Sequence, residues 1–282
     1  MPGERPTLHI TIGGFDPPSD LTWATLWQLS DREPWAVVAR HETALHVRVS
    51  DCAHFRLTSS SVQILPAAGV RASTIRHLLL DQLLPLLLAR DGHLVLHASG
   101  LRIAGGAIAI AGAAGAGKST LAAALSAEGW TVTSDDGVLV EEGAIPLAVP
   151  AYPGLRLWPE TLDVTAMRER CVGEVAEYSA KCRVAPPRRE PEGAAPLHHV
   201  YVLARGSHPS LETLAARDAS VAVFSHAYRA DLTDRAALAA QLEACARFVE
   251  RVPVTRLTVP HDLSQLRATA RLLSAHATVA AS

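Results

Sequence analysis

The sequence predicts an α/β protein in which a small β-rich domain precedes a larger domain of alternating strands and helices. Residues 7–65 contain short segments in which apolar and polar side chains alternate, a pattern typical of half-buried strands. From residue 94 onward, short apolar segments alternate with longer helical patterns, which is typical of a layered α/β fold. The 282 residues, 49% hydrophobic and 19% charged, are enough to form a packed core. We therefore expect one domain at residues 1–90 and a second at 91–282.

The expected first domain combines short strands with a long apolar helix. The alternation is clearest at residues 45–50, 55–58 and 62–64, each of which we expect to form a strand. Residues 73–90 are apolar nearly all round at helical spacing. Because a helix that is apolar on every side is stable only when it is buried, this segment predicts a buried helix between the two domains.

Apolar periodicity and turn residues give the order of the elements in the second domain. Ser99-Gly100 is expected to form a turn, and Asp231 or Thr233 is expected to cap a helix. Residues 185–196, rich in proline, glycine and charge, predict a surface loop. The expected strands cover 94–98, 101–103, 107–111, 130–134, 138–140, 199–204 and 254–259, and the expected helices cover 118–128, 159–171, 234–250 and a last one from Asp262 or Ser264.

Charge and hydrophobicity argue against two classes of function. With a net charge of −2, the chain has no basic field that could bind nucleic acid by releasing counterions. The most apolar run, residues 78–89, is shorter than the ~20 residues that a membrane span needs. The first five residues show no secretory signal pattern. The four cysteines form no CxxC motif, so we expect free thiols in a reduced, cytoplasmic protein that contacts neither nucleic acid nor membrane.

A glycine-rich segment between an expected strand and an expected helix predicts a phosphate-binding loop. The sequence GAAGAGKS matches the pattern G-x-x-x-x-G-K-[ST]. Glycines allow consecutive backbone N–H groups to surround a phosphate, and the following helix N-terminus adds a positive dipole end. The lysine can reach the β- and γ-phosphates, and the serine hydroxyl can bind Mg²⁺. The expected nucleotide-binding residues are Gly112, Ala113, Ala114, Gly115, Ala116, Gly117, Lys118, Ser119 and Thr120.

The scarcity of lysine adds weight to this motif. Only Lys118 and Lys181 are lysines among the 26 basic residues. Lysine and arginine differ in shape and donor geometry, so a chain that uses arginine nearly everywhere retains lysine by chance or where a guanidinium cannot replace it. Lys181 is therefore a candidate for a second cation near the transferred phosphate, where it would stabilise charge in the transition state.

Two adjacent carboxylates follow the next expected strand. Asp135 and Asp136 end the segment 130–134, and strands beside the loop strand end at the edge of the sheet where ligands bind. Neighbouring residues on a strand point to opposite faces, so the two acids can take different roles. One would bind Mg²⁺ and the other would accept a proton from a substrate hydroxyl. The sequence does not decide which aspartate binds Mg²⁺ and which accepts the proton.

These pieces together resemble a known family. The order His97-Ala-Ser, an antiparallel strand pair, GAAGAGKS, a helix, Gly129-Trp130 and then Ser134-Asp135-Asp136 resembles the C-terminal kinase domain of HPr kinase/phosphorylase over residues 93–140. That family has a P-loop fold shared with phosphoenolpyruvate carboxykinase. The stretch 152–159 is similar to small HPr-kinase-related proteins of peptide-modification clusters. These include the lasso-peptide tailoring kinases, which phosphorylate a serine of a precursor peptide.

The resemblance implies roles for individual residues. His97 would lie beside the acid pair and the transferred phosphate. Asp136 would be the general base and Asp135 a partner of Mg²⁺ or of His97, while the phosphate-loop motif itself makes Ser119 a metal ligand. Arg156 would stabilise phosphate charge. Relatives of HPr kinase assemble, so a homo-oligomer is a state that the resemblance allows.

The sequence therefore predicts an ATP- and Mg²⁺-dependent kinase that transfers the γ-phosphate to a serine hydroxyl of a peptide or small protein. Two alternatives stay open. The acceptor would be a small molecule, such as a sugar or amino acid, if the acceptor site is deeply enclosed. The chain would be a nucleotide-dependent switch if Lys118→Met abolished its function and Asp136→Asn did not.

Overall fold

The computed structural model describes residues 8–28, 34–103, 105–152, 154–185, 193–229 and 234–280. The chain divides into two compact units, Met1–Leu79 and Leu80–Ser282. The division falls inside the segment expected to be one helix, which consists of α1 (Ala72–His77), the π-helical segment η1 (Leu78–Leu83) and α2 (Leu84–Arg90). Asp81 therefore belongs to the second unit, although the sequence predicts it in the first domain, residues 1–90.

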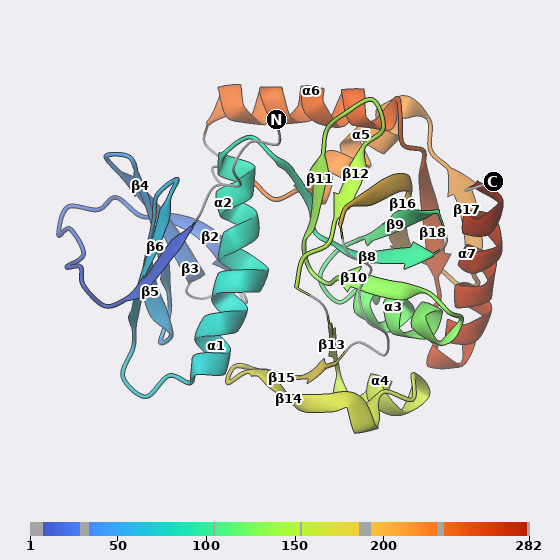
Figure 1. The fold of residues 1–282 in the computed structure, drawn as a ribbon, viewed down its shortest axis with the longest axis horizontal. Helices are drawn as coiled ribbons and strands as arrows, with labels where there is room; N and C mark the ends of the chain where they lie inside the picture. The colour runs from blue at the N-terminus through green and yellow to red at the C-terminus, as the bar shows by residue number, and fades with distance from the viewer. Residues whose placement is uncertain are drawn as a thin grey trace. The chain divides into compact units, whose positions relative to one another are not determined.

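The first unit is built on a six-stranded sheet in the order β1-β6-β5-β4-β3-β2 (Figure 1). All neighbours are antiparallel except β1 and β6, which are parallel. The strands expected at residues 45–50 and 55–58 are confirmed, and Val47 pairs with Phe55 with both side chains buried. The alternation is incomplete, because His46 is buried as well. The strands are β1 (His9–Ile12), β2 (Ala24–Gln28), β3 (Pro34–His41), β4 (Ala44–Val49), β5 (Ala53–Leu57) and β6 (Ser61–Pro66).

The second unit is a mixed α/β structure with two sheets. A nine-stranded sheet contains the path β10-β8-β9-β16-β12-β11-β7, with β18 paired to β16 and β17 to β18, and a three-stranded sheet has the order β13-β15-β14. The strands are β7 (Leu94–Leu96), β8 (Ala98–Ile103), β9 (Gly106–Ala111), β10 (Thr131–Ser134), β11 (Val138–Glu141), β12 (Leu147–Val149), β13 (Leu155–Leu157), β14 (Cys171–Ala176), β15 (Ser179–Val184), β16 (Ala195–Arg205), β17 (Ser210–Thr213) and β18 (Val254–Val259). The helices after α2 are α3 (Lys118–Ala127), α4 (Pro159–Val164), α5 (Ala216–Ser225), α6 (Arg235–Val249) and α7 (Leu266–Ala280).

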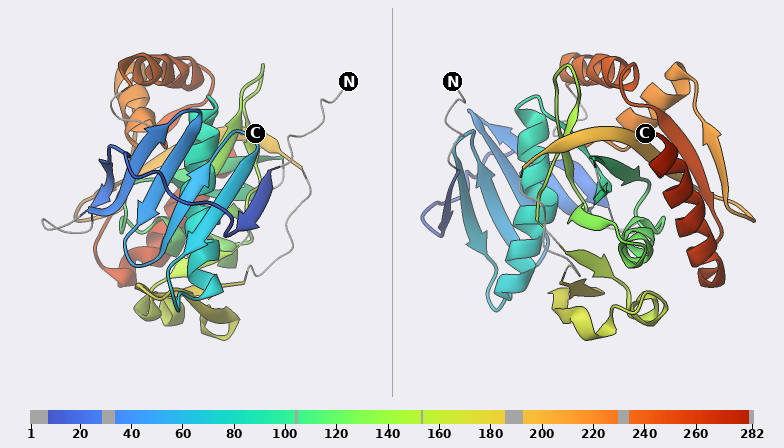
Figure 2. Two further views of the ribbon diagram at one scale, coloured as in Figure 1. Left: turned by 90° about the vertical axis from the view of Figure 1, so that its left-hand side faces the viewer. Right: turned by 45° about the vertical axis from the view of Figure 1, so that its right-hand side comes forward.

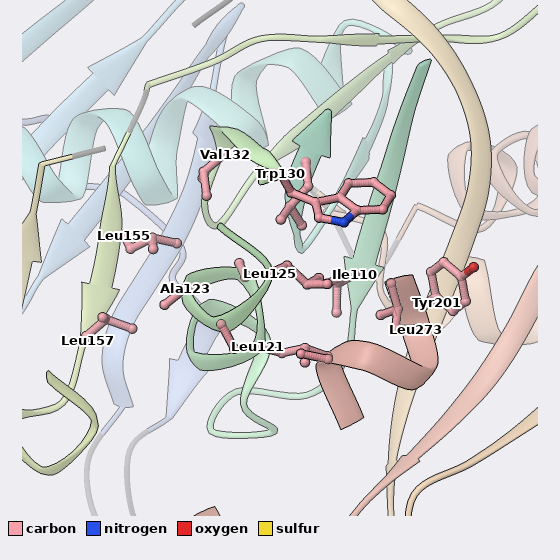
Figure 3. Close-up of a cluster of buried hydrophobic side chains, with 14 of the residues drawn as sticks. Ile110, Leu121, Ala123, Leu125, Trp130, Val132, Leu155, Leu157, Tyr201 and Leu273 are labelled. Carbon is pink, nitrogen blue, oxygen red and sulfur yellow. The ribbon is translucent and has the colours of Figure 1, made fainter. Parts of the chain in front are cut away.

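Helices cover both faces of the large sheet because side chains alternate along its central strands. On β9, Ile108 and Ile110 share one face and belong to a cluster with side chains of α3 and α7. Figure 3 shows Ile110 among them, near Leu121 and Leu125 of α3. Ala107, Ala109 and Ala111 point to the other face, in the cluster that includes side chains of α5 and α6. Figure 2 shows α7 beside α3 and the central strands. Because both faces are covered, every residue of β9 is buried and the strand is a continuous apolar run in the sequence.

The structure corrects several local expectations. Ser99-Gly100 is not a turn, because β8 runs without a break from Ala98 and the interruption falls at His97. The helix expected at 159–171 ends at Val164. The long helix is capped by Asp234, whose side chain accepts the N–H of Ala237. The alternative caps Asp231 and Thr233, and most of the loop expected at 185–196, lie outside the described residues.

The expectation of four thiols is wrong for one pair of cysteines. Cys171 and Cys182 form a disulfide with 5.8 Å between their Cα atoms. They lie on the neighbouring antiparallel strands β14 and β15, and strand pairing brings residues within the range of Cα distances that a disulfide requires. Spacing in the sequence does not reveal this register. Cys52 and Cys245 are buried and lie outside the disulfide. Among the described residues, no helix is both long and apolar enough to cross a membrane.

Candidate functional site

The glycine-rich segment forms the loop between β9 and α3. Gly115 and Gly117 have φ angles of +74° and +104°, a left-handed conformation that glycine adopts without strain. At Gly112 the space is closed, because an added Cβ would lie 3.1 Å from Cβ of Leu203. The loop therefore needs glycine for two reasons, backbone conformation at its far end and close packing at its start.

Lys118 begins α3 and its side chain bends back into the loop. Its Nζ donates to the carbonyl oxygens of Gly112 at 2.9 Å and of Ala113 at 3.2 Å. Burial lowers the pKa of Lys118, and the negative charges of Asp136 and Asp135 oppose that shift. The ammonium thus lies at the loop, close enough to both carboxylates to interact with them.

The acid pair reaches the same edge of the sheet through two antiparallel pairings. β8 is antiparallel to β9, and β10 is antiparallel to β8, so β9 and β10 run in the same direction. Ala98 pairs with Ala111, and Ser134 pairs with Gly100. Hence β9 and β10 both end at the edge where β8 begins. The expectation that the acid-bearing strand adjoins the loop strand is wrong, because β8 lies between them, but the shared edge is confirmed.

Asp135 lies in a pocket of hydrogen-bond donors, which we call the Asp135 pocket (Ser99, Ser119 and Arg156). The hydroxyls of Ser99 and Ser119 donate to its Oδ1 at 2.5 and 3.0 Å. The backbone N–H of Arg156 donates to its Oδ2 at 3.0 Å. Burial and the neighbouring charge of Asp136 raise the pKa of Asp135, against the effects of Arg156 and the two hydroxyls.

Asp136 has a different environment, the Asp136 pocket (His97 and Tyr228). Its Oδ1 lies 3.8 Å from His97 Nε2, and its carbonyl oxygen accepts from the Tyr228 hydroxyl at 3.2 Å. Burial opposes ionisation of Asp136, but His97, Arg156 and Lys181 together outweigh burial and lower its pKa. Its φ of +103° is an uncommon conformation for a residue with a Cβ, and such strain clusters at functional sites.

A buried ion pair supports both pockets. Arg156 and Asp81 form a two-point contact in which Nε donates to Oδ2 at 3.2 Å and Nη2 donates to Oδ1. Their side chains are 2% and 7% exposed. Arg156 Nη1 also donates to the carbonyl oxygens of Gly154 at 2.9 Å and Asp135 at 3.4 Å. The guanidinium of Arg156 is therefore occupied by protein acceptors in this structure.

Sequence reasoning missed Asp81, Ser99 and the contact made by Tyr228. The Tyr228 hydroxyl lies 3.1 Å from the carbonyl oxygen of Asp81 and 3.2 Å from that of Asp136. A signal for Asp81 was present, because it is an acid inside the most apolar run of the chain. It lies in the π-helical segment η1, and π-helical turns occur frequently at functional sites.

Lys181 reaches the site from the three-stranded sheet. Arg156 pairs with Arg183 across β13 and β15, so this register places Lys181 near Trp158. Lys181 Nζ lies 5.5 Å from the centroid of the Trp158 ring, within the range of a cation–π contact. The charge of Lys181 lowers the pKa of Asp136 and the pKa of Lys118, so it influences both the acid pair and the glycine-rich loop. The five candidate catalytic residues thus form one charge network.

The donor set suits a magnesium ion bound together with phosphates. No group of three or more His, Cys, Asp or Glu side chains that could hold a metal occurs in the part of the chain that the structure describes. Ser119 Oγ and Asp135 Oδ1 are hard oxygen donors 3.0 Å apart. Mg²⁺ prefers oxygen ligands and is usually bound by one or two carboxylates and the substrate phosphates. The residues present therefore fit Mg²⁺ at this position.

The fold and site define a mixed α/β protein with a glycine-rich loop and an acid pair at one edge of its sheet. No family model matches the chain, and no curated protein matches it. Among solved structures, it is similar to the HPr(Ser) kinase/phosphatase from Coxiella burnetii, with 13% sequence identity and a TM-score of 0.34. The match covers 65% of this chain and 98% of that one.

Proposed function

We propose that the chain is an ATP- and Mg²⁺-dependent kinase that transfers the γ-phosphate to a serine hydroxyl of a peptide or small protein. The observation that supports this proposal is the juxtaposition of two neighbouring carboxylates in different environments beside a glycine-rich loop. Phosphoryl transfer from a nucleotide uses a metal ion near the phosphates and a residue that orients the nucleophile or accepts its proton. The resemblance of residues 93–140 to HPr kinase supports serine as the acceptor.

Phosphate binding would use the loop and Lys118. The backbone N–H groups of the loop and the N-terminus of α3 favour a bound anion. Lys118 Nζ is held by two neutral carbonyl oxygens, at 2.9 and 3.2 Å. A charged phosphate oxygen is a stronger acceptor than either carbonyl. We therefore expect Lys118 to exchange these contacts for the β- and γ-phosphates.

In this proposal Ser119 and Asp135 hold the metal. Bound there, Mg²⁺ would neutralise charge on the β- and γ-phosphate oxygens. The network of Ser99 and the Arg156 N–H fixes the carboxylate of Asp135, which limits the reorganisation needed when the metal binds. The contact of Ser119 with Asp135 Oδ1 supports Asp135, rather than Asp136, as the metal ligand in this proposal.

Asp136 would orient the acceptor hydroxyl and take its proton. The lowered pKa keeps Asp136 ionised near neutral pH, so that it can accept a hydrogen bond from a serine O–H. Phosphoryl transfer passes through a loose transition state, and little covalent chemistry is required of the protein. His97, 3.8 Å from Asp136 Oδ1, would fix the direction of the carboxylate. Lys181 would stabilise charge on the transferred group.

The test is a phosphorylation assay on the full chain. The protein is incubated with Mg²⁺-ATP and a pooled library of serine peptides, and mass spectrometry detects peptides that gain one phosphoryl group. We expect phosphopeptides with wild type and none with Lys118→Met. ADP without phosphopeptides would replace the peptide acceptor by a small molecule or by a switch function. Absence of both ADP and phosphopeptides, with the nucleotide still bound, would overturn the catalytic roles of Asp135 and Asp136.

A further inference from the structure

A second feature of the glycine loop lies away from the acid pair. A cavity of about 170 Å³ is lined by residues 113–116, by Leu203, Ala204 and Arg205 at the end of β16, and by Val259 at the end of β18. β9, β16 and β18 are parallel neighbours in that order, so their carboxyl ends share one edge. β8 and β10 lie on the other side of β9. The cavity and the acid pair therefore flank the loop from opposite sides.

Arg205 is anchored to the loop itself. Its Nη2 donates to the carbonyl oxygen of Gly115 at 2.8 Å, while the residue remains exposed to solvent. This contact directs a planar cation to the border of the cavity. Leu203 and Val259, each 8% exposed, supply apolar walls. A planar guanidinium beside apolar walls is the chemistry that stacks against a flat aromatic ring.

The position of the cavity limits what it would hold. It is smaller than the ~300–1,000 Å³ of pockets that enclose a whole ligand, so it has room for one ring system rather than for a nucleotide. If phosphates occupy the loop, the ribose and base of the nucleotide must extend from the loop toward one of its two sides. The side of β8 and β10 contains Asp135 and Asp136, where the proposed acceptor would react. The side of β16 and β18 contains the cavity.

We propose that this cavity binds the base of a nucleoside triphosphate, with Arg205 stacking on the ring. The inference rests on the proposed function and adds to it the place where the base of the nucleotide binds and the side chain that contacts it. The side chains of the cavity other than Arg205 are Ala, Leu and Val, so the cavity selects for a flat ring and does not distinguish adenine from guanine through its side chains.

The experiment compares ligands with and without a base. Calorimetry measures the affinities of the full chain for ATP and for inorganic tripolyphosphate, each with Mg²⁺. Two variants alter the cavity, Arg205→Ala by removing the planar cation and Ala204→Phe by filling the space. Arg251→Ala is the matched control, because Arg251 is another exposed arginine that donates to a backbone carbonyl, that of Gly143 at 2.7 Å.

Wild type should bind ATP more tightly than tripolyphosphate. Because a guanidinium over the face of a ring attracts it, Arg205→Ala should weaken ATP binding about tenfold. Ala204→Phe should also weaken ATP binding, and both variants should change tripolyphosphate binding less than twofold. Arg251→Ala should change neither.

Two results would overturn the inference and leave the kinase proposal standing. One is equal affinity of wild type for ATP and tripolyphosphate. The other is equal weakening of both ligands in Arg205→Ala, which would mean that Arg205 acts only through the shape of the loop. If wild type bound neither ligand, the phosphate-binding role of the loop would fail, and both proposals with it.

Discussion

Asp135 and Asp136 are neighbours in the chain but differ in almost every physical respect. The Asp135 pocket consists of neutral donors, two hydroxyls and a backbone N–H, that contact the carboxylate directly. The Asp136 pocket fixes mainly the backbone, through Tyr228 and the carbonyl oxygen of Ala98, and leaves His97 beside the carboxylate. The pKa of Asp135 is raised and that of Asp136 is lowered. Two identical side chains are thus given different chemistry by their surroundings.

The conformation of Asp136 explains how adjacent residues come to have such different environments. With φ at +103°, the chain turns sharply after Asp135. The N–H of Asp136 donates to Ala98 O at 3.2 Å, and Tyr228 contacts its carbonyl oxygen, so the strained conformation is fixed from both sides. Backbone strain therefore has a specific consequence here, the separation of two carboxylates.

The largest expected effect comes from neutralising each aspartate in turn. Asp136→Asn should lower kcat about 10²–10⁴-fold, because a proton acceptor is lost, and should leave the affinity for Mg²⁺-ATP nearly unchanged. Asp135→Asn should remove the Mg²⁺-dependent part of nucleotide affinity as well as turnover. Steady-state kinetics and calorimetry with and without Mg²⁺ would separate the two. Identical profiles for both variants would show that the pockets do not divide the roles.

The next effect concerns the ion pair that supports the Asp135 pocket. Asp81→Asn should destabilise the protein by about 3–5 kcal/mol, because it leaves the buried guanidinium of Arg156 without its carboxylate. Urea unfolding measures this difference. Asp163→Asn is the matched control, since Asp163 also makes a two-point contact with an arginine, Arg168, but the side chains are 65% and 58% exposed.

We expect no measurable change in unfolding for the control, because exposed pairs contribute little. Equal unfolding midpoints for wild type and Asp81→Asn would mean that the buried pair does not support the site. A melting transition recorded by circular dichroism would show whether each variant folds.

The smallest effect concerns His226, near the Asp136 pocket, and the dependence of protein stability on pH. The carbonyl oxygen of His226 accepts a hydrogen bond from the backbone N–H of His97, with 2.7 Å between N and O. Burial, with added repulsion from His97, Lys118 and Arg229, lowers the pKa of the His226 side chain to about 4. The unfolded state then binds a proton at higher pH than the folded state, so this residue lowers stability as pH falls from about 6.5 to about 4.

His226→Gln should flatten the dependence of the unfolding free energy on pH across that window. Denaturant unfolding at several pH values measures the slope. His54 and His199 have pKa values lowered to about 4 as well, so the slope should decrease without vanishing. An unchanged slope would contradict a buried neutral His226.

Local sequence determined the parts of this protein that depend on nearby residues. The strand, glycine loop and helix at 107–127 follow from one motif, because backbone conformation and helix initiation are set within a few residues. The position of the acids at the end of β10 is local as well. The helix α6 follows from apolar spacing.

Only the tertiary structure decided which distant residues meet at the site. The register of β8 against β9 and β10 places Ser99 on Asp135, and the pairing of β13 with β15 brings Lys181 near Trp158. Asp81 is distant from Arg156 in the chain, and no pattern of sequence spacing predicts that the two residues pair. The same is true of Cys171 and Cys182, whose pairing depends on strand register. Hydrogen-bond register between separate segments is a property of the whole fold, and local periodicity does not contain it.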